Sequence, residues 1–393
     1  MRTPLAWKNL TSSWAKCALA ATGVGFAVVL MFMQIGFQRA LIDNNVRVMT
    51  LLDPSVANLA IMSRARYNVS TEQRFPRSLL EQAIAHPAIR QGCVLSMERG
   101  TARVTVENWT GKPIRVLALE MGKPEFLADA GLYSRLNAAD SKDGVLLDTR
   151  SKRFYGFASE LTELGEQWIE LNGKRVLVEE RFDLGTDFGN DGTLLMSERM
   201  HSEYFPYRNL RGRPTDVVDI GFLELDPAAG LSPQQVAKQI EALSPNEIMV
   251  QPTLGLIAKE KRFWELQTPV GKIFLIGTIM GLLVGAIICY QIQFTDITEH
   301  MPEFATLKAM GYGPMYFWSL VLSQSFYLAC LGFVPGIAVA QTLYFVLSES
   351  SGLIMEMDVT RIVSVWVLTL VMCAVSGALA IRKLFNADPA SLF

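Results

Sequence analysis

Four long apolar segments stand out along an otherwise mixed sequence. Residues 17–37, 273–290, 315–347 and 362–381 contain no charged side chain. A helix that rises about 1.5 Å per residue needs roughly 20 apolar residues to cross a hydrocarbon core of about 30 Å. The pattern therefore predicts four membrane-spanning helices. We expect the first to be retained rather than cleaved as a signal peptide, because it is long and lacks a small-residue cleavage site.

Small and polar residues inside these segments predict contacts between helices. Gly277, Gly281 and Gly285 recur at every fourth position, so they share one face on which another helix can approach closely. The Ser323–Ser325 step is polar, and we expect it to bond to a neighbouring helix because lipid offers no partner. Pro335 lies inside the third segment and favours a bend there.

Residues 38–272 have the polar and apolar mixture of a soluble domain. Alternating apolar residues predict strands over 102–107 and 113–120, whereas residues 76–89 favour a helix. Residues 168–179 place Asn172 and Gly173 between two alternating runs, which is the pattern of a tight hairpin. The mixture predicts an α+β domain.

A second helix in this domain carries its own start signal. Ser232, Pro233 and Gln235 match an N-cap, a first-turn proline and a capping box, for a helix that runs through Leu243. At the ends of the domain, residues 38–52 and 256–271 extend the neighbouring spans as stalk ends. Either they act as levers between membrane and domain or they are simple linkers, and the pattern leaves both open.

Four spans place both termini on the same side of the membrane. The short loop 348–361 has a single basic residue, Arg361, so the positive-inside rule favours cytoplasmic termini and an inner-membrane location. Residues 38–272 are then extracytoplasmic. Within residues 1–16, Leu5, Trp7, Leu10 and Trp14 recur near helical spacing and predict an amphipathic interfacial helix, while residues 382–393 form a cytoplasmic tail.

Composition and motifs argue against several functions. A net charge of −2 offers no basic field for nucleic acid. The chain has no P-loop, no H-E-x-x-H and no G-x-S-x-G pattern, and its five cysteines lack metal-site spacing. Residues 185–193 fail the calcium-loop pattern and predict a polar turn. The three histidines, His86, His201 and His300, are interpreted as surface or turn residues. We expect no catalytic, cofactor or metal site, and no enzymatic activity.

The loop between the second and third spans, residues 291–314, holds a short predicted helix. Pro302 and Glu303 suit its start, and Gly311 suits its stop. Phe304, Leu307 and Met310 would lie on one flank. Because so short a helix is unstable alone, we expect it to pack on the bundle end or on another protein.

The run from Asp296 to Tyr312 (DITEHMPEFATLKAMGY) resembles the signature of DevC-type permeases, a branch of the MacB/FtsX-like family of ABC transporter membrane subunits. Residues 5–10, 147–151 and 387–390 add to the resemblance. It implies a MacB-like periplasmic domain between the first and second helices. It also implies a homodimer whose outer domains move when a cytoplasmic ATPase hydrolyses ATP with Mg. MacB has this ATPase fused before its first span; here we expect it on a separate chain.

By analogy, the segment from Thr295 to Tyr312 would be the element that couples to the ATPase. The predicted contact residues are Glu299, Glu303, Leu307, Lys308, Met310 and Gly311. The resemblance further implies efflux through a periplasmic adaptor of the membrane-fusion type and an outer-membrane channel, with membrane lipid or glycolipid as candidate cargo. Two alternatives stay open. One is an FtsX-like signalling subunit that controls an extracytoplasmic partner, and the other is a membrane receptor or scaffold without an ATPase.

Overall fold

The computed structural model describes residues 14–106, 111–157, 167–187, 189–208 and 212–386. The chain divides into two compact units. The membrane unit contains the chain up to Arg39, residues 268–347 and the chain from Met355 onward, and the outer unit contains residues 40–267 and 348–354. The predicted interfacial helix over residues 1–16 lies almost entirely outside the described residues.

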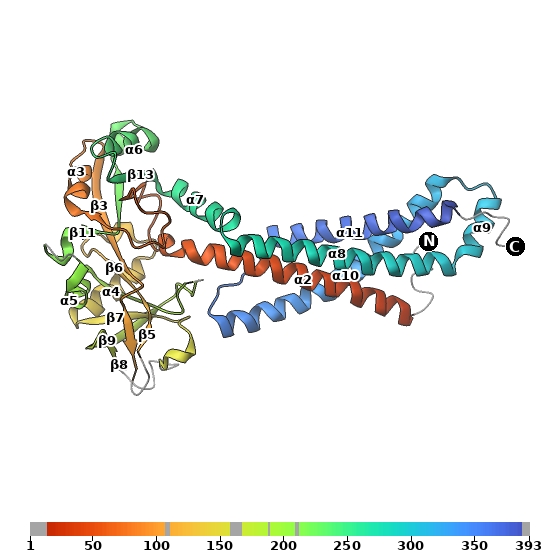
Figure 1. Ribbon diagram of the computed structural model, residues 1–393, viewed down its shortest axis with the longest axis horizontal. Helices are drawn as coiled ribbons and strands as arrows, with labels where there is room; N and C mark the ends of the chain where they lie inside the picture. The colour runs from red at the N-terminus through yellow and green to blue at the C-terminus, as the bar shows by residue number, and fades with distance from the viewer. Residues whose placement is uncertain (1–13, 107–110, 158–166, 188, 209–211, 387–393) are drawn as a thin grey trace. The chain divides into compact units, whose positions relative to one another are not determined.

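Four helices in the described chain are long and apolar enough to cross a membrane. They are α2 (Trp14–Val46), α8 (Pro269–Glu299), α10 (Pro314–Ser351) and α11 (Val359–Asn386), and they run side by side in Figure 1. With the α+β outer unit described below, they confirm the predicted fold class. The protein is a multi-pass membrane protein.

Each of these helices extends beyond the apolar segment that predicted it. The second was expected to end at residue 290, yet α8 continues to Glu299 because residues 291–299 contain no glycine or proline to stop it. The first continues to Val46, and a single 3-10 turn, η1 (Arg47–Leu51), follows it. The second stalk end is helical too, as α7 (Thr253–Leu266), which stops before Pro269.

Glycines set the closest approach between these helices. A Cβ on Gly332 of α10 would lie 2.4 Å from the Val24 side chain and 3.0 Å from the Gly25 backbone nitrogen of α2. The backbones of α2 and α10 therefore nearly touch, as small residues permit in membrane helices. On α8, the predicted packing glycines Gly277, Gly281 and Gly285 lie against α2. Their nearest α2 side chains are Gln34, Leu30 and Ala27, in that order.

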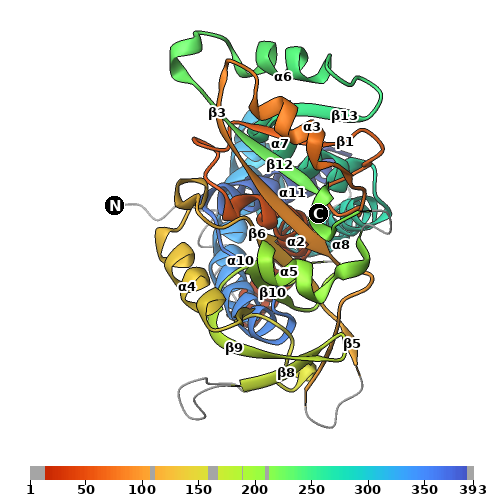
Figure 2. The same ribbon diagram turned by 90° about the vertical axis from the view of Figure 1, so that its left-hand side faces the viewer.

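The outer unit is built on one mixed sheet of eleven strands. Its order is β13-β1-β12-β3-β6-β10-β7-β9-β8-β4-β5, and only the β10/β6 and β7/β9 pairs are parallel. Figure 2 shows β3 crossing the sheet between β12 and β6. The strands are β1 (Leu59–Ser63), β3 (Ile89–Glu98), β4 (Arg103–Thr105), β5 (Lys112–Pro113), β6 (Arg115–Leu119), β7 (Gly144–Asp148), β8 (Gln167–Leu171), β9 (Lys174–Phe182), β10 (Thr193–Ser197), β12 (Ile220–Leu225) and β13 (Ile248–Pro252).

Helices cover both faces of this sheet. Successive residues of β3 point to opposite faces, so Cys93 and Leu95 enter one apolar cluster with Leu132 of α4, while Val94 enters another with Ile240 of α6. The helices of the outer unit are α3 (Arg77–Ile84), α4 (Ala130–Ser141), α5 (Glu198–Tyr204), α6 (Pro233–Glu241) and α7, and a separate small ladder joins β2 (Phe75–Pro76) to β11 (Val217–Val218).

The local signals in this unit are confirmed with one exception. Strands β8 and β9 form the predicted hairpin, with Asn172 and Gly173 at φ 51° and 81°. Ser232 and Gln235 form the predicted capping box at the start of α6. The helix predicted over residues 76–89 is wrong at its end, because α3 stops at Ile84, before Pro87, and β3 begins at Ile89.

The short loop between α10 and α11 groups with the outer unit. The Thr186 backbone N–H donates to the Gly352 carbonyl at 3.3 Å, and the Thr186 hydroxyl donates to the Ser351 carbonyl at 3.0 Å. Gly352 has φ +73°, and a Cβ there would lie 2.4 Å from the Arg150 carbonyl oxygen, so only glycine fits. The outer unit is thus completed by residues 348–354.

The crossing of α2 and α10 predicts a difference between two glycine-to-alanine changes. Gly332→Ala should destabilise the membrane unit by about 1–3 kcal/mol, because its Cβ meets Val24 and the α2 backbone. Gly281→Ala is the matched control, since its Cβ would make an ordinary contact with Leu30 at 3.7 Å. Thermal unfolding of the full chain in detergent measures both, and equal melting temperatures would contradict the close crossing.

Candidate functional site

A short helix, α9 (Met301–Ala309), joins the end of α8 to the start of α10. Pro302 and Glu303 occupy its first turn, as predicted from the sequence. At its other end Gly311 has φ +92°, and its N–H donates to the Lys308 carbonyl at 3.1 Å. Glycine adopts this left-handed conformation without steric cost, so the helix ends there and the chain turns into α10.

One face of α9 is buried in the membrane unit. Met301, Phe304 and Ala305 are at most 6 % exposed. Met301 and Phe304 belong to an apolar cluster with residues of the three adjacent long helices, namely Ile297 of α8, Phe317, Leu320 and Val321 of α10, and Ala380 and Ile381 of α11. The rings of Phe304 and Phe317 lie edge to face with centroids 6.2 Å apart. This packing supplies the support that a nine-residue helix lacks by itself.

Side chains on the other side of α9, in the turn that follows and at the start of α10 are exposed. We call this the coupling surface and define it by Glu303, Lys308, Met310, Tyr312 and Met315. Met310 is 63 % exposed and Met315 is 83 % exposed. The surface therefore presents apolar side chains beside one acidic and one basic group. Exposed apolar side chains with a polar surround are typical of protein interaction sites.

The structure separates the residues predicted to contact an ATPase. Glu303, Lys308 and Met310 are exposed together, with Gly311 beside them in the turn. Leu307 instead packs partly against the buried cluster, and Glu299 is exposed at the end of α8 rather than on α9. Along the predicted flank, Phe304 is buried and Leu307 is half-buried, whereas Met310, the C-cap residue of α9, is 63 % exposed.

Polar contacts tie the end of α8 to its neighbours. Gln324 of α10 donates to the Asp296 carboxylate at 3.2 Å, and the Ser325 hydroxyl donates to the Gln293 side-chain oxygen at 2.8 Å. The Gln293 amide in turn donates to the Cys373 carbonyl of α11 at 3.1 Å. The prediction that the Ser323–Ser325 step bonds to a neighbouring helix is confirmed for Gln324 and Ser325. These bonds hold the helix end that carries α9.

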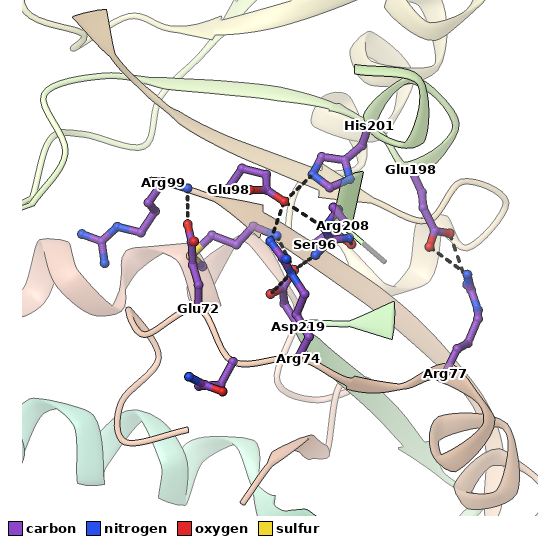
Figure 3. Close-up of polar contacts among 12 residues, drawn as sticks. Glu72, Arg74, Arg77, Ser96, Glu98, Arg99, Glu198, His201, Arg208 and Asp219 are labelled. Carbon is purple, nitrogen blue, oxygen red and sulfur yellow. Dashed lines mark hydrogen bonds and ion pairs between the residues drawn. The ribbon is translucent and has the colours of Figure 1, made fainter. Parts of the chain in front are cut away.

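The outer unit contains a second polar feature, a buried ionic cluster (Figure 3). We define it by Arg74, Glu98, His201, Arg208 and Asp219. Glu98 and Asp219 are fully buried, and Arg208 is 8 % exposed. The Glu98 carboxylate lies 2.7 Å from Arg74 and 2.8 Å from Arg208, while Asp219 pairs with Arg208 and lies 3.5 Å from Arg74. Two guanidinium groups thus balance two carboxylates.

Hydrogen bonds with three other groups complete this cluster. The Met97 backbone N–H donates to Asp219 at 2.9 Å, the Thr101 hydroxyl donates to Glu98 at 2.7 Å, and Arg208 donates to the Ser96 hydroxyl at 3.1 Å. The groups come from β3 and the turn after it, from α5, from the 3-10 turn η4 (Pro206–Arg208), and from the residues directly before β2 and β12. The cluster therefore joins segments that are distant in the sequence.

His201 is the neutral member of the cluster. Its ring is tilted against that of Phe205 with centroids 4.8 Å apart, and its Nε2 atom lies 3.9 Å from Glu98, too far for a hydrogen bond. Burial, together with Arg208 and Arg74, lowers the pKa of His201 well below its usual value. Burial raises the pKa of Glu98, which Thr101 and the arginines partly oppose.

The sequence-based interpretation of His201 as a surface or turn residue is wrong, since it is 1 % exposed. His86 and His300 are half-buried, each near a helix end. No spacing pattern links the members of the ionic cluster, so the sequence offered no signal for it. Residues 185–187 and 189–193 form the predicted polar turn, in which Asp187 pairs with buried Arg115. Among the described residues, no group of three metal-ligating side chains occurs.

A known protein family matches the C-terminal part of the chain, which lies mostly in the membrane unit. Residues 275–389 match the FtsX-like permease C-terminal family, and this segment carries α9 and the coupling surface. This segment is an FtsX-like permease C-terminal domain. The resemblance to the MacB/FtsX-like family is thereby confirmed, and with it an ABC-type permease. Membership of the DevC branch stays a prediction. No curated protein matches the chain.

Solved structures that match part of this chain share little sequence with it. One is the periplasmic region of MacB from Actinobacillus actinomycetemcomitans, 9% identical, with a TM-score of 0.34 over 52% of this chain and 94% of that one. Another is the extracellular domain of the noncanonic ABC-type transporter YknZ from Gram-positive bacteria, 10% identical, with a TM-score of 0.32 over 49% of this chain and 98% of that one.

The buried ionic cluster predicts a large cost for removing one carboxylate. Asp219→Asn should destabilise the permease by about 3–5 kcal/mol, because it leaves the Arg74 and Arg208 guanidinium groups with Glu98 as the one carboxylate of the cluster. Arg90→Gln is the control, since it breaks an exposed pair with Glu224 that contributes at most about 1 kcal/mol. Denaturant unfolding of the full chain in detergent compares them, and a similar small effect in both would show that the cluster is dispensable.

His201 predicts acid sensitivity of the folded permease. Its pKa is lowered in the folded state. Below about pH 6.5 the His201 side chain is therefore protonated in the unfolded chain but stays neutral in the folded chain. Stability should therefore fall with pH below that point, by up to about 1.4 kcal/mol per pH unit from this residue. His201→Phe should flatten the decline in melting temperature between pH 7.5 and 5.5. His86→Gln, outside the cluster, should retain it, and an unchanged slope in His201→Phe would refute the assignment.

Proposed function

We propose that this permease is the membrane subunit of an ABC-type efflux transporter, and that a separate cytoplasmic ATPase binds its coupling surface. The observation that carries the proposal is the two-sided character of α9. Its buried side packs against the three neighbouring long helices. Its other side belongs to the coupling surface, where exposed Met310, Tyr312 and Met315 lie beside Glu303 and Lys308. Force applied to such a helix passes to the bundle instead of moving a loose loop.

The chain connectivity supports transmission of this movement to the outer unit. Helix α2 is unbroken from Trp14 to Val46 and contributes residues to both units. The α10–α11 loop belongs with the outer unit through its hydrogen bonds to Thr186. The stalk ends thus fit levers better than linkers, because both are helical over most of their length.

The remaining parts of the proposal follow the family resemblance. The permease would act as a homodimer in the inner membrane with cytoplasmic termini, and the partner ATPase would use ATP and Mg. A periplasmic adaptor and an outer-membrane channel would receive the cargo, with lipid or glycolipid as the candidate class. The chain itself would be non-catalytic.

Co-purification with the candidate ATPase in detergent tests the coupling surface. Met310→Asp and Glu303→Lys should each reduce the ATPase recovered with the permease by at least about tenfold, in line with 1.4 kcal/mol or more lost at a central contact. Both side chains are exposed, so the fold should be unaffected. Glu356→Lys is the matched control, because it makes the same charge change in the α10–α11 loop.

The result separates the proposed function from its alternatives. Loss of the ATPase in the two variants, with normal recovery in Glu356→Lys, supports the efflux permease and its coupling surface. If the native chain never retains an ATPase, the proposal fails and a receptor or scaffold becomes the better account. If the ATPase is retained equally by all variants, the docking site lies elsewhere.

A further inference from the structure

A pocket in the outer unit gathers arginine side chains from three separate segments. Its volume is about 380 Å³. We call it the arginine pocket and define it by Arg47 at the start of η1, Arg135 of α4 and Arg181 of β9, with Thr50 and Thr149 beside them. All five residues belong to the outer unit. The coupling surface and the ionic cluster share none of them.

The charges in and around the arginine pocket favour an anion. Two carboxylates also line it, but each is already engaged. Asp129 pairs with Arg135 at 3.2 Å and caps α4 by accepting from the Gly131 N–H at 2.8 Å. Asp183 pairs at 2.9 Å with Arg150, which stands outside the lining. Three guanidinium groups and two carboxylates thus line the pocket, which leaves a net positive charge, and Arg150 outside it neutralises one of the carboxylates.

The arginines are held in place differently. Arg135 is oriented by its pair with Asp129 and by a hydrogen bond from its guanidinium to the Arg181 carbonyl at 2.8 Å. Arg47 is half-buried, and no ion-pair partner for it appears in the described part of the chain. A guanidinium that faces a pocket without a carboxylate partner is well suited to an incoming oxyanion, which it can bind through two parallel hydrogen bonds.

The other walls of the pocket are apolar, formed by Leu51, Leu132, Phe182 and Leu184. Such a mixture of a few convergent polar groups with apolar walls is typical of small-molecule sites, and the volume lies at the small end of their range. A fully hydrated inorganic ion would leave these walls unused. A headgroup attached to an apolar portion would contact both the arginines and the leucines.

We propose that the arginine pocket binds a phosphate-bearing group, supplied either by the headgroup of an amphiphile or by a free phosphate compound. Arg47 and Arg181 contact the phosphate oxygens, Thr149 provides a hydroxyl donor, and Arg135 lies beside them. The Thr50 hydroxyl donates to the Arg47 carbonyl at 2.8 Å and so holds the turn that carries Arg47. The site stands apart from the proposed ATPase interface. Its occupancy is measured without an ATPase, so its failure would leave the proposed function untouched.

Binding to the purified full chain in maltoside detergent at 0.15 M salt tests this site with three probes. They are inorganic phosphate, dioctanoyl phosphatidic acid and dioctanoyl glycerol, the last of which lacks the phosphate. Phosphatidic acid should bind, dioctanoyl glycerol should not, and Arg47→Gln combined with Arg181→Gln should weaken binding at least tenfold. Arg90→Gln, an exposed arginine elsewhere on the outer unit, is the matched control and should bind like the native chain.

The outcomes distinguish the two sources of phosphate. Tighter binding of phosphatidic acid than of inorganic phosphate, lost in the double variant, identifies an amphiphile headgroup. Equal arginine-dependent binding of both identifies a free phosphate compound. If neither probe binds, or if the double variant binds as the native chain does, the proposal is overturned. Should Arg181→Gln fail to fold, Arg47→Gln alone decides, because that half-buried side chain supports no described ion pair.

Discussion

The burial of one face of α9 is the constraint on which the rest of the functional argument depends. A nine-residue helix has too few hydrogen bonds to persist alone, so its position is set by the contacts of Met301, Phe304 and Ala305. Those contacts reach α8, α10 and α11 together. Because one face of α9 packs on the bundle, the opposite side remains exposed. A partner that binds this exposed side is therefore coupled through α9 to the membrane helices.

The outer unit is stabilised by a different kind of interaction. Its sheet is apolar on both faces, yet Glu98, Asp219 and Arg208 lie buried at one place on it. Removing such charges from water costs free energy, and this desolvation cost is offset because each carboxylate contacts arginines and a hydrogen-bond donor. An arrangement of this kind favours one mutual placement of β3, α5 and the chain before β12, which suits a domain proposed to move as a body.

Local chemistry explains why some features were predictable from the sequence. The four apolar segments, the Asn172-Gly173 hairpin and the capping box at Ser232 each depend on residues within a few positions, so the pattern carries the whole physical cause. The start and stop of α9 belong to this group through Pro302 and Gly311. The helix predicted over residues 76–89 is too long because the prediction did not take Pro87 into account, and α3 ends at Ile84, before this proline.

The sequence by itself determined the membrane class, the α+β outer unit and the family resemblance, because these depend on composition, periodicity and a contiguous motif. Only the tertiary structure decided which side of α9 is free, why Met310 is exposed while Leu307 is not, and that residues 348–354 belong with the outer unit. It also brought His201 into the ionic cluster and Arg47 beside Arg181. These contacts join residues that are far apart in the sequence. Their burial and their electrostatic interactions therefore exist only in the folded chain.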